Sequence, residues 1–467
     1  MVFSSHIFVY YFLPLLLVVY FNFPHRARNA LLVVVSYLFY GWWNPYFMSL
    51  MLLATLVNYG CGQVICRPGA SRRARRTALI GSVVASLGLL AFFKYFMFLT
   101  HSVNSLLAWC EPQLPVLRVT LPIGISFYTF QALSYTVDVY RGDARPARSL
   151  VDFACFVSLF PQLIAGPILR YHTVAEQLVA RQHTSSRVAS GITLFIVGFA
   201  KKILLANTVG GISDEVFRSA SPLPQDAWFG VVAYAFQIYF DFSAYSDMAV
   251  GLGRIVGFEF PRNFNAPYLA DSITDFWRRW HISLSTFLRD YLYVPLGGNR
   301  KGPARTYVNL ATVMLFGGLW HGANWTFVVW GAMHGALLIW ERAMDKKPWY
   351  AAFPRPVRVA LTFGLVLVSW VFFRADSLSD AGDFLAAMFG LAETPSGSWL
   401  LAASIYSPVH LLAMAACVAV VVQPRQAFDW SSRPLRVPGV VGLLVLFVAA
   451  LAVMSTQSLN PFLYFQF

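Results

Sequence analysis

The sequence predicts an all-α, polytopic membrane protein, with residues 1–467 forming one transmembrane domain. Of its residues, 58% are hydrophobic and only 12% are charged, whereas a soluble globular domain is about 45–50% apolar and about 25% charged. Apolar runs recur from residue 7 to residue 456, and no polar block is large enough to fold alone. A soluble multidomain enzyme, a disordered protein and a single-anchor protein are therefore excluded.

The basic residues set the expected topology. Thirty-five Lys and Arg against 21 Asp and Glu give a net charge of +14 at pH 7, and the basic residues fall in short patches between apolar runs, as the positive-inside rule predicts. The first run, 7–23, has no Lys or Arg before it and is followed by Arg26 and Arg28, which is the reverse of a secretory signal. We expect a retained first span with the N-terminus outside the cytoplasm.

Further spans are predicted from the other apolar runs, of which 31–43 is short for about 30 Å of hydrocarbon and would have to tilt or thin the bilayer locally. The basic cluster at 67–76 places one loop in the cytoplasm, and residues 111–112 belong to a loop on the opposite side. We expect about ten or eleven spans, with the C-terminus outside. The candidate runs are 7–23, 31–43, 46–65, 78–99, 119–140, 188–205, 228–250, 308–321, 325–341, 357–373, 406–423 and 437–456.

Two regions depart from this pattern. Residues 151–170 are apolar but broken by Pro161 and Pro167, so we expect a re-entrant segment beside an internal cavity, since non-helical backbone at membrane depth must be surrounded by protein or water. Residues 258–306 are polar and rich in Trp and Arg, which is typical of a cytoplasmic interfacial layer. No internal repeat is evident, which argues against an inverted-repeat transporter.

One candidate site lies in that layer, where residues 272–291 are expected to form an amphipathic helix. At about 3.6 residues per turn, Trp277, Trp280 and His281 share its apolar face. The other side carries Arg278, Arg279 and Arg289. The helix is either an interfacial anchor with a packing histidine or the carrier of a functional histidine.

A second histidine, His321, lies between glycines in the apolar run at 308–321. An ionisable residue is costly there and is a functional-site hypothesis, although it could simply hydrogen-bond between helices. His334 is a weaker candidate, because on a continuous helix it lies about 20 Å further along. The pKa of histidine suits general-base catalysis. Since the sequence lacks GxSxG, HExxH and P-loop motifs, such a histidine would activate a hydroxyl of another molecule.

Asp241 and Asp247 place two carboxylates in the apolar run at 228–250. Spaced six residues apart, they lie on different helix faces and need separate partners, for which we expect the arginines of 278–305. Lys201 and Lys202 are interpreted as snorkelling anchors.

The loop at 297–302 is rich in glycine and carries Arg300 and Lys301. Such a loop can hold phosphate through its backbone N–H groups and cations, or it can serve topology alone. No metal site is expected, because the five cysteines are scattered and no CxxC occurs.

Several strings of residues together resemble the membrane-bound O-acyltransferase (MBOAT) family. The resemblance extends to both ends of the chain, at 1–5 and 460–467. Within the family, the chain is most similar to the bacterial branch that O-acetylates alginate or cellulose. The internal strings are 121–130, 239–248, 276–285, 293–300 and 317–322.

The resemblance implies a helical bundle with a central tunnel, and a membrane O-acetyltransferase of the bacterial inner membrane. His321 matches the family's catalytic histidine and His281 its second catalytic position. The implied donor is cytoplasmic acetyl-CoA, with no permanently bound cofactor. The implied receiver is a periplasmic, SGNH-type partner within a polysaccharide biosynthesis complex.

On this resemblance, the basic residues around His281 are expected to hold the polyanionic part of the coenzyme, so the positive charge indicates neither nucleic acid nor topology alone. The expected coenzyme-binding residues are Trp277, Arg278, Arg279, Trp280, Arg289, Arg300 and Lys301. Two other functions remain open from the sequence, a transporter or export-channel subunit and a non-catalytic scaffold of a secretion complex. The polymer, alginate or cellulose, is also left open.

Overall fold

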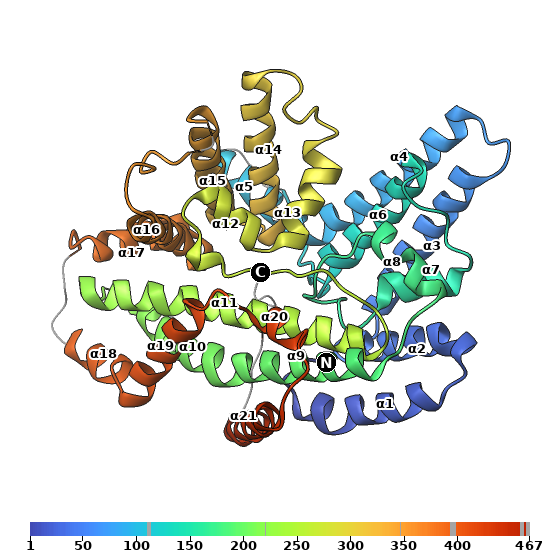
Figure 1. The fold of residues 1–467 in the computed structure, drawn as a ribbon. Helices are drawn as coiled ribbons and strands as arrows, with labels where there is room; N and C mark the ends of the chain where they lie inside the picture. Colours follow the sequence, from blue (N-terminus) through green and yellow to red (C-terminus); the bar gives the residue numbers. More distant parts are fainter. Residues whose placement is uncertain (110–113, 220, 346, 393–397, 458–461, 464–467) are drawn as a thin grey trace. The chain divides into compact units, whose positions relative to one another are not determined.

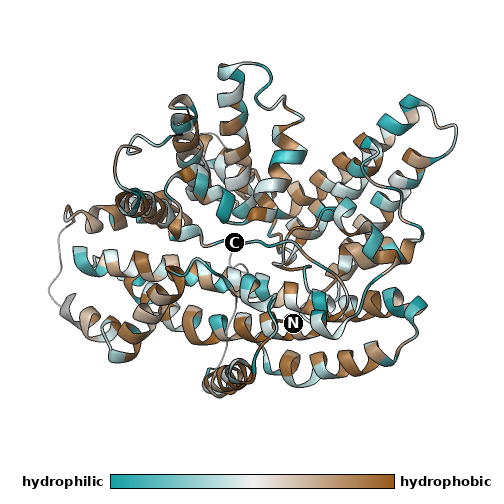
Figure 2. Ribbon diagram, viewed as in Figure 1, coloured by the Kyte–Doolittle hydropathy of each residue, from teal (hydrophilic) through white to brown (hydrophobic). Residues whose placement is uncertain are grey.

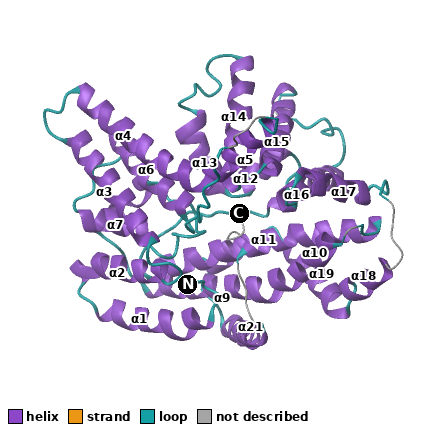
Figure 3. Cartoon of the chain, turned by 180° about the vertical axis from the view of Figure 1, so that it is seen from behind, coloured by secondary structure: helices purple, strands orange, loops and turns teal. Residues whose placement is uncertain are grey.

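The computed structural model describes residues 1–109, 114–219, 221–345, 347–392, 398–457 and 462–463. Within these ranges every regular element is a helix (Figure 3), which confirms the predicted all-α fold. The expected loop at 111–112 and most of the closing string at 460–467 lie outside the described residues. The chain divides into two compact units, Met1–Ile192 with Ala249–Pro261, and Thr193–Met248 with Arg262–Phe467. The single domain stays a prediction.

The first unit is a set of short and medium helices (Figure 1). They are α1 (Leu13–Asn22), α2 (Arg28–Gly41), α3 (Phe47–Cys66), α4 (Arg72–Leu90), α5 (Phe96–Leu106), α6 (Ile125–Arg141), α7 (Leu150–Ser158) and α8 (Tyr171–Val179). A buried polar network joins α3, α4 and α6. Ser82 Oγ donates to Asn58 Oδ1 at 2.6 Å and lies 2.7 Å from Thr136 Oγ1. Because buried polar groups need partners, these contacts fix how the three helices pack.

The apolar run at 119–140 is helical only from Ile125 onward. Gly124 has φ +75°, and a Cβ there would lie 2.9 Å from the carbonyl oxygen of Leu163. The helix therefore begins later than predicted, because a left-handed glycine precedes it where two backbones approach closely.

The segment expected to be re-entrant is irregular, as its prolines indicate. Helix α7 ends at Ser158, and the chain then continues in turns through Pro161 and Pro167 while remaining buried. Gln162 Nε2 donates to the carbonyl oxygen of Phe156 at 2.7 Å, which satisfies one backbone group at the helix end. The placement of residues 151–170 within a membrane stays a prediction.

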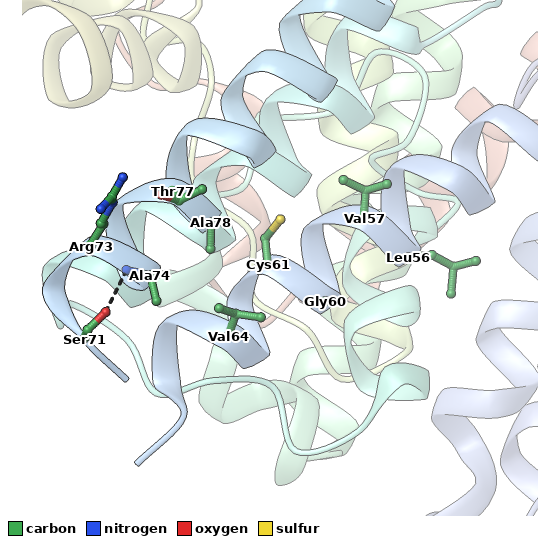
Figure 4. Close-up of a pocket in the computed structure, with 10 residues that line it drawn as sticks. All are labelled: Leu56, Val57, Gly60, Cys61, Val64, Ser71, Arg73, Ala74, Thr77 and Ala78. Atoms are coloured by element: carbon green, nitrogen blue, oxygen red, sulfur yellow. Dashed lines mark hydrogen bonds between the residues drawn. The ribbon is translucent and has the colours of Figure 1, made fainter. Parts of the chain in front are cut away.

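The basic cluster predicted as a loop is largely helical. Ser71 caps α4 by accepting a hydrogen bond from the backbone N–H of Ala74 at 3.1 Å, so the arginines at 72, 73, 75 and 76 lie in the first turns of a helix. Positive side chains near the N-terminus of a helix are unfavourable to the helix dipole. Helix stability therefore does not explain these arginines, and the positive-inside rule does. Figure 4 shows the shallow groove that this end of α4 forms with α3. The lining residues are Leu56, Val57, Gly60, Cys61, Val64, Ser71, Arg73, Ala74, Thr77 and Ala78.

The second unit contains most of the longest helix of the described residues, α11 (Pro224–Ile255). The boundary between the units passes through α9 (Ser185–Ala200) and α11. The other helices are α10 (Asn207–Arg218), α12 (Ile273–Arg279), α13 (Ile282–Leu288), α14 (Pro303–His321), α15 (Trp325–Ala343), α16 (Arg355–Arg374), α17 (Leu378–Met388), α18 (Ser398–Ile405), α19 (Pro408–Val421), α20 (Ala427–Ser431) and α21 (Val437–Thr456).

Helices α14 and α15 form a closely packed hairpin, and α15 also contacts α12 and α16. Glycines make the close approach possible. A Cβ at Gly318 would lie 2.3 Å from the carbonyl oxygen of Phe327, and a Cβ at Gly331 would lie 2.5 Å from that of Met314. Backbones at this separation leave no room for a side chain.

Within the described residues, five helical segments are long and apolar enough to cross a membrane. They are Phe47–Cys66, Arg72–Leu106, Ser185–Arg218, Arg355–Arg374 and Val437–Thr456, and two shorter apolar segments are Phe8–Asn22 and Pro408–Val421. Figure 2 shows hydrophobic residues along α1 and α21, and many large apolar side chains of α21 are exposed. The protein is therefore a multi-pass membrane protein, while the number of spans stays a prediction.

The structure corrects the predicted roles of Lys201 and Lys202, which are only 9% and 3% exposed. They lie in a π-helical turn that continues α9. Lys201 pairs with Asp247 at 2.7 Å and Lys202 with Asp241 at 2.5 Å. The lysines are therefore not snorkelling anchors, and the carboxylates do not pair with arginines of 278–305. The reason is the close packing of α9 on α11, where a Cβ at Gly198 would lie 2.7 Å from a carbonyl oxygen of α11.

Removing one member of such a buried pair leaves the other charge unpaired. We expect Lys202→Met to destabilise the protein by about 3–5 kcal/mol and to lower its thermal midpoint in detergent. The matched control is the double variant with Asp241→Asn, which removes both charges and keeps an oxygen for the Leu463 N–H that Asp241 accepts. A double variant no more stable than Lys202→Met would contradict this account.

Candidate active site

The segment that carries His281 is not the single helix predicted for 272–291. Helix α12 ends at Arg279, Trp280 is extended, and His281 has φ +44° and ψ +53° before α13 begins at Ile282. A left-handed conformation costs a non-glycine residue roughly 1–2 kcal/mol, so contacts elsewhere must hold this break.

Those contacts come from residues 263–265, which lie beside the break. The N–H of Asn265 donates to the carbonyl oxygen of Arg279, and the N–H of Ile282 donates to that of Asn263, both at 2.9 Å. At the start of α12, the buried Glu341 accepts the N–H groups of Ile273 and Thr274 at 2.7 and 2.9 Å. The break is therefore fixed by residues distant in sequence.

His281 is 0% exposed and lies in an aromatic and amide environment. Its Nδ1 is 3.2 Å from Asn263 Oδ1, and its ring meets that of Phe242 edge-on at 4.6 Å. Burial lowers the pKa of His281 to about 3, because the charged imidazolium loses its hydration. The imidazole is therefore neutral at physiological pH.

His321 is the last residue of α14 and is 5% exposed. Its ring centroid lies 6.3 Å from that of His281, so the structure brings together two histidines forty residues apart. The rings of Trp330 and Phe373 pack edge-on against His321 at 5.3 and 5.2 Å. These large apolar side chains restrict water around the pair.

His334 is closer to this site than a continuous helix allows. The helix ends at His321 and restarts at Trp325, so α15 folds back along α14. His334 Nδ1 accepts from Trp277 Nε1 at 3.3 Å, and its Nε2 lies 3.1 Å from Ser369 Oγ. With both nitrogens occupied, His334 is a packing residue that orients Trp277.

The predicted coenzyme-binding residues differ in their exposure and in their partners. Trp280 is buried against Trp370 and Tyr268. Arg279 pairs with Asp275 at 2.8 Å and Arg289 with Asp290 at 2.7 Å. The exposed cations of the set are Arg278, Arg289, Arg300 and Lys301.

The loop before α14 owes its shape to Gly297, Gly298 and Gly302, all with positive φ. Asn309 Nδ2 donates to the carbonyl oxygen of Gly298 at 2.8 Å and ties the loop to α14. No cluster of three or more His, Cys, Asp or Glu suited to a metal ion occurs in the described parts of the chain.

Sequence reasoning missed two residues that hold the segment carrying His281. Asn263 lies in an irregular stretch with no periodic or motif signal. Glu341 could have been found, because a carboxylate at the end of the predicted span 325–341 needs a partner. Asn263, His281 and His321 form the polar part of an otherwise aromatic centre, which suits proton transfer and stabilisation of charge away from water. Glu341 holds the start of α12.

Known proteins are similar to this chain, and one of them matches over its whole length. The model of the MBOAT, membrane-bound O-acyltransferase family matches residues 144–374. The probable alginate O-acetylase AlgI of Azotobacter vinelandii is 44% identical over 100% of both chains. The peptidoglycan O-acetyltransferase of Helicobacter pylori is 37% identical over 84% of this chain and 80% of its own. The teichoic acid D-alanyltransferase of Bacillus subtilis is 25% identical over 57% and 68%. The chain therefore belongs to the membrane-bound O-acyltransferase family and is a multi-pass membrane acyltransferase.

Proposed function

We propose that the protein moves acetyl groups from cytoplasmic acetyl-CoA across the bacterial inner membrane for O-acetylation of an exopolysaccharide. The observation that carries this proposal is the buried pair of His281 and His321, with ring centroids 6.3 Å apart, inside the region that matches the family. The names of two relatives, an alginate O-acetylase and a peptidoglycan O-acetyltransferase, support a carbohydrate acceptor.

In the proposed reaction, His321 removes the proton from the acceptor hydroxyl as its oxygen attacks the thioester carbonyl. The carbon–sulfur bond of the tetrahedral intermediate then breaks, and the leaving thiolate takes the proton back from the imidazolium to give free CoA. His281 either holds the substrate beside His321 or stabilises the oxyanion. The surrounding aromatic side chains limit hydrolysis of the thioester by excluding water.

The coenzyme phosphates are proposed to bind the cationic residues that surround this segment. Arg278, Arg289, Arg300 and Lys301 are exposed, and charge-assisted contacts from such groups are the strong ones for phosphate. The glycines of 297–302 allow backbone N–H groups to join them. Arg279, Trp277 and Trp280 complete the proposed set by positioning the segment.

The immediate receiver is proposed to be a periplasmic SGNH-type partner in a polysaccharide biosynthesis complex, with both termini of this chain on the periplasmic side. Alginate is the proposed polymer, because the relative from Azotobacter vinelandii, which matches over the full length of both chains, is named a probable alginate O-acetylase. Cellulose remains the alternative polymer.

The test uses the full chain in proteoliposomes with radiolabelled acetyl-CoA and the partner protein. We expect label to pass to alginate oligosaccharides and to be competed by unlabelled CoA. Cellulose and peptidoglycan fragments are the comparison acceptors. Failure to consume acetyl-CoA in the presence of all acceptors would refute the donor, and labelling of another polymer alone would refute alginate.

A further inference from the structure

Asn263 makes an unusual set of contacts with the residues around His281. Its Oδ1 accepts from the backbone N–H and from the hydroxyl of Ser283, at 3.1 and 2.9 Å, and lies 3.2 Å from His281 Nδ1. A backbone N–H can only donate. The amide atom that faces it must therefore be the oxygen, so the orientation of the Asn263 side chain is determined by chemistry.

That orientation also determines the tautomer of His281. An amide oxygen has no hydrogen to give, so the contact at 3.2 Å requires a hydrogen on Nδ1. In a neutral imidazole the other nitrogen, Nε2, then carries a lone pair. Nε2 is buried and has no hydrogen-bond partner among the described residues. A buried acceptor without a partner costs roughly 1–3 kcal/mol, which a functional site can retain for a substrate.

We propose that Asn263 is a positioning residue that holds His281 in the Nδ1–H tautomer and makes Nε2 an acceptor for an O–H or N–H group of a bound substrate. The inference rests on the proposed acyl transfer. His281 could either hold the substrate beside His321 or stabilise the oxyanion, and the proposed tautomer allows only the first of these roles. A neutral imidazole without hydrogen on Nε2 cannot donate to an oxyanion.

Two substitutions separate this role from simple packing. Asn263→Leu keeps the approximate size of the side chain and removes the oxygen, so His281 can adopt either tautomer; we expect kcat to fall about 10²-fold. Asn263→Asp keeps an oxygen in the same place and adds a negative charge, which raises the pKa of His281.

The Asp variant should show a distinctive dependence on pH. Because a raised pKa means that His281 is protonated at higher pH, and the imidazolium cannot accept a hydrogen bond, activity should approach the wild-type value above about pH 7 and fall toward about pH 5.5. The wild type should show no such fall from His281. Thr286→Ala is the control. Thr286 lies on α13, the helix that follows His281, and its hydroxyl bonds only to carbonyl groups of the same helix.

The measurements are kcat, KM and their pH profiles for acetyl transfer, with gel filtration and thermal midpoint as checks of folding. Full activity in Asn263→Leu, or an Asn263→Asp variant with the wild-type pH profile, would overturn the inference. ¹⁵N NMR of histidine-labelled protein, compared with His281→Asn, gives a readout without activity. A hydrogen found on Nε2 of His281 in these spectra would also overturn the inference. Absence of acetyl transfer by the wild type, with the Nδ1–H tautomer present, would instead count against the proposed function alone.

Discussion

Replacing His321 with alanine is expected to reduce acetyl transfer by about 10²–10⁴-fold, the usual contribution of a general base. The ring centroid of His321 lies 6.3 Å from that of His281, and the rings of Trp330 and Phe373 pack against His321. Water is poorly placed to substitute for the lost imidazole among these side chains. The measurement is polysaccharide-bound acetate in cells and acetyl transfer in proteoliposomes, both normalised to protein in the membrane.

His334→Asn is the matched control for this prediction. His334 is also fully buried and contacts Trp330, at 4.9 Å, but both of its nitrogens bond to packing partners. We expect this variant to lose stability while its turnover per folded molecule stays within a few-fold of the wild type. Unchanged acetylation by His321→Ala at a normal membrane level would refute the assignment of the catalytic base.

Gly318→Ala is expected to lower the yield of folded protein strongly, although it adds only one methyl group. The new Cβ would lie 2.3 Å from the carbonyl oxygen of Phe327 and 3.2 Å from the Cα of Gly331. Both obstacles are backbone atoms, so relief requires α14 and α15 to separate. Overpacking that forces the backbone to shift costs typically about 1–3 kcal/mol and occasionally more. The measurement is the yield of monodisperse protein by gel filtration in detergent.

The neighbouring glycine provides the control. A Cβ at Gly317 would meet only the Cδ1 atom of Leu288 at 3.5 Å, an ordinary contact. We expect Gly317→Ala to give wild-type yield, although an intrinsic helix preference would favour alanine equally at both positions. Similar yields for the two variants would show that the α14–α15 hairpin is looser than the structure indicates.

Helices governed by the length of an apolar run were predicted closely. The predicted run at 437–456 coincides with α21, and the run at 325–341 nearly coincides with α15 (Trp325–Ala343). Capping residues at their ends are local in sequence, as in Asn324, which accepts the N–H of Thr326. The helix predicted for 272–291 failed because its break is imposed by residues 263–265, a long-range contact that periodicity does not encode.

In the candidate site, too, features local in sequence were predicted and features that depend on long-range contacts were not. His281 and His321 were predicted as site residues because a histidine in an apolar setting stands out chemically. The structure places their ring centroids 6.3 Å apart, and their catalytic roles stay predictions. Asn263 gave no signal, since its contribution exists only once Ser283 and His281 are folded beside it. The partner of Asp241 was predicted wrongly because the need of a buried carboxylate for a cation does not reveal which helix packs on α11; the partner is Lys202.

The buried Lys–Asp pairs also bear on how the chain enters the membrane. The span predicted at 228–250 lies within α11 and would carry both Asp241 and Asp247. A charged side chain at the centre of a spanning helix costs about 2.5–3.5 kcal/mol on insertion. The lysines that neutralise these aspartates lie on the segment Ser185–Arg218, which leaves the ribosome first. We therefore expect this earlier segment to remain beside the translocon until α11 emerges, so that the two helices enter the lipid together as a neutral pair.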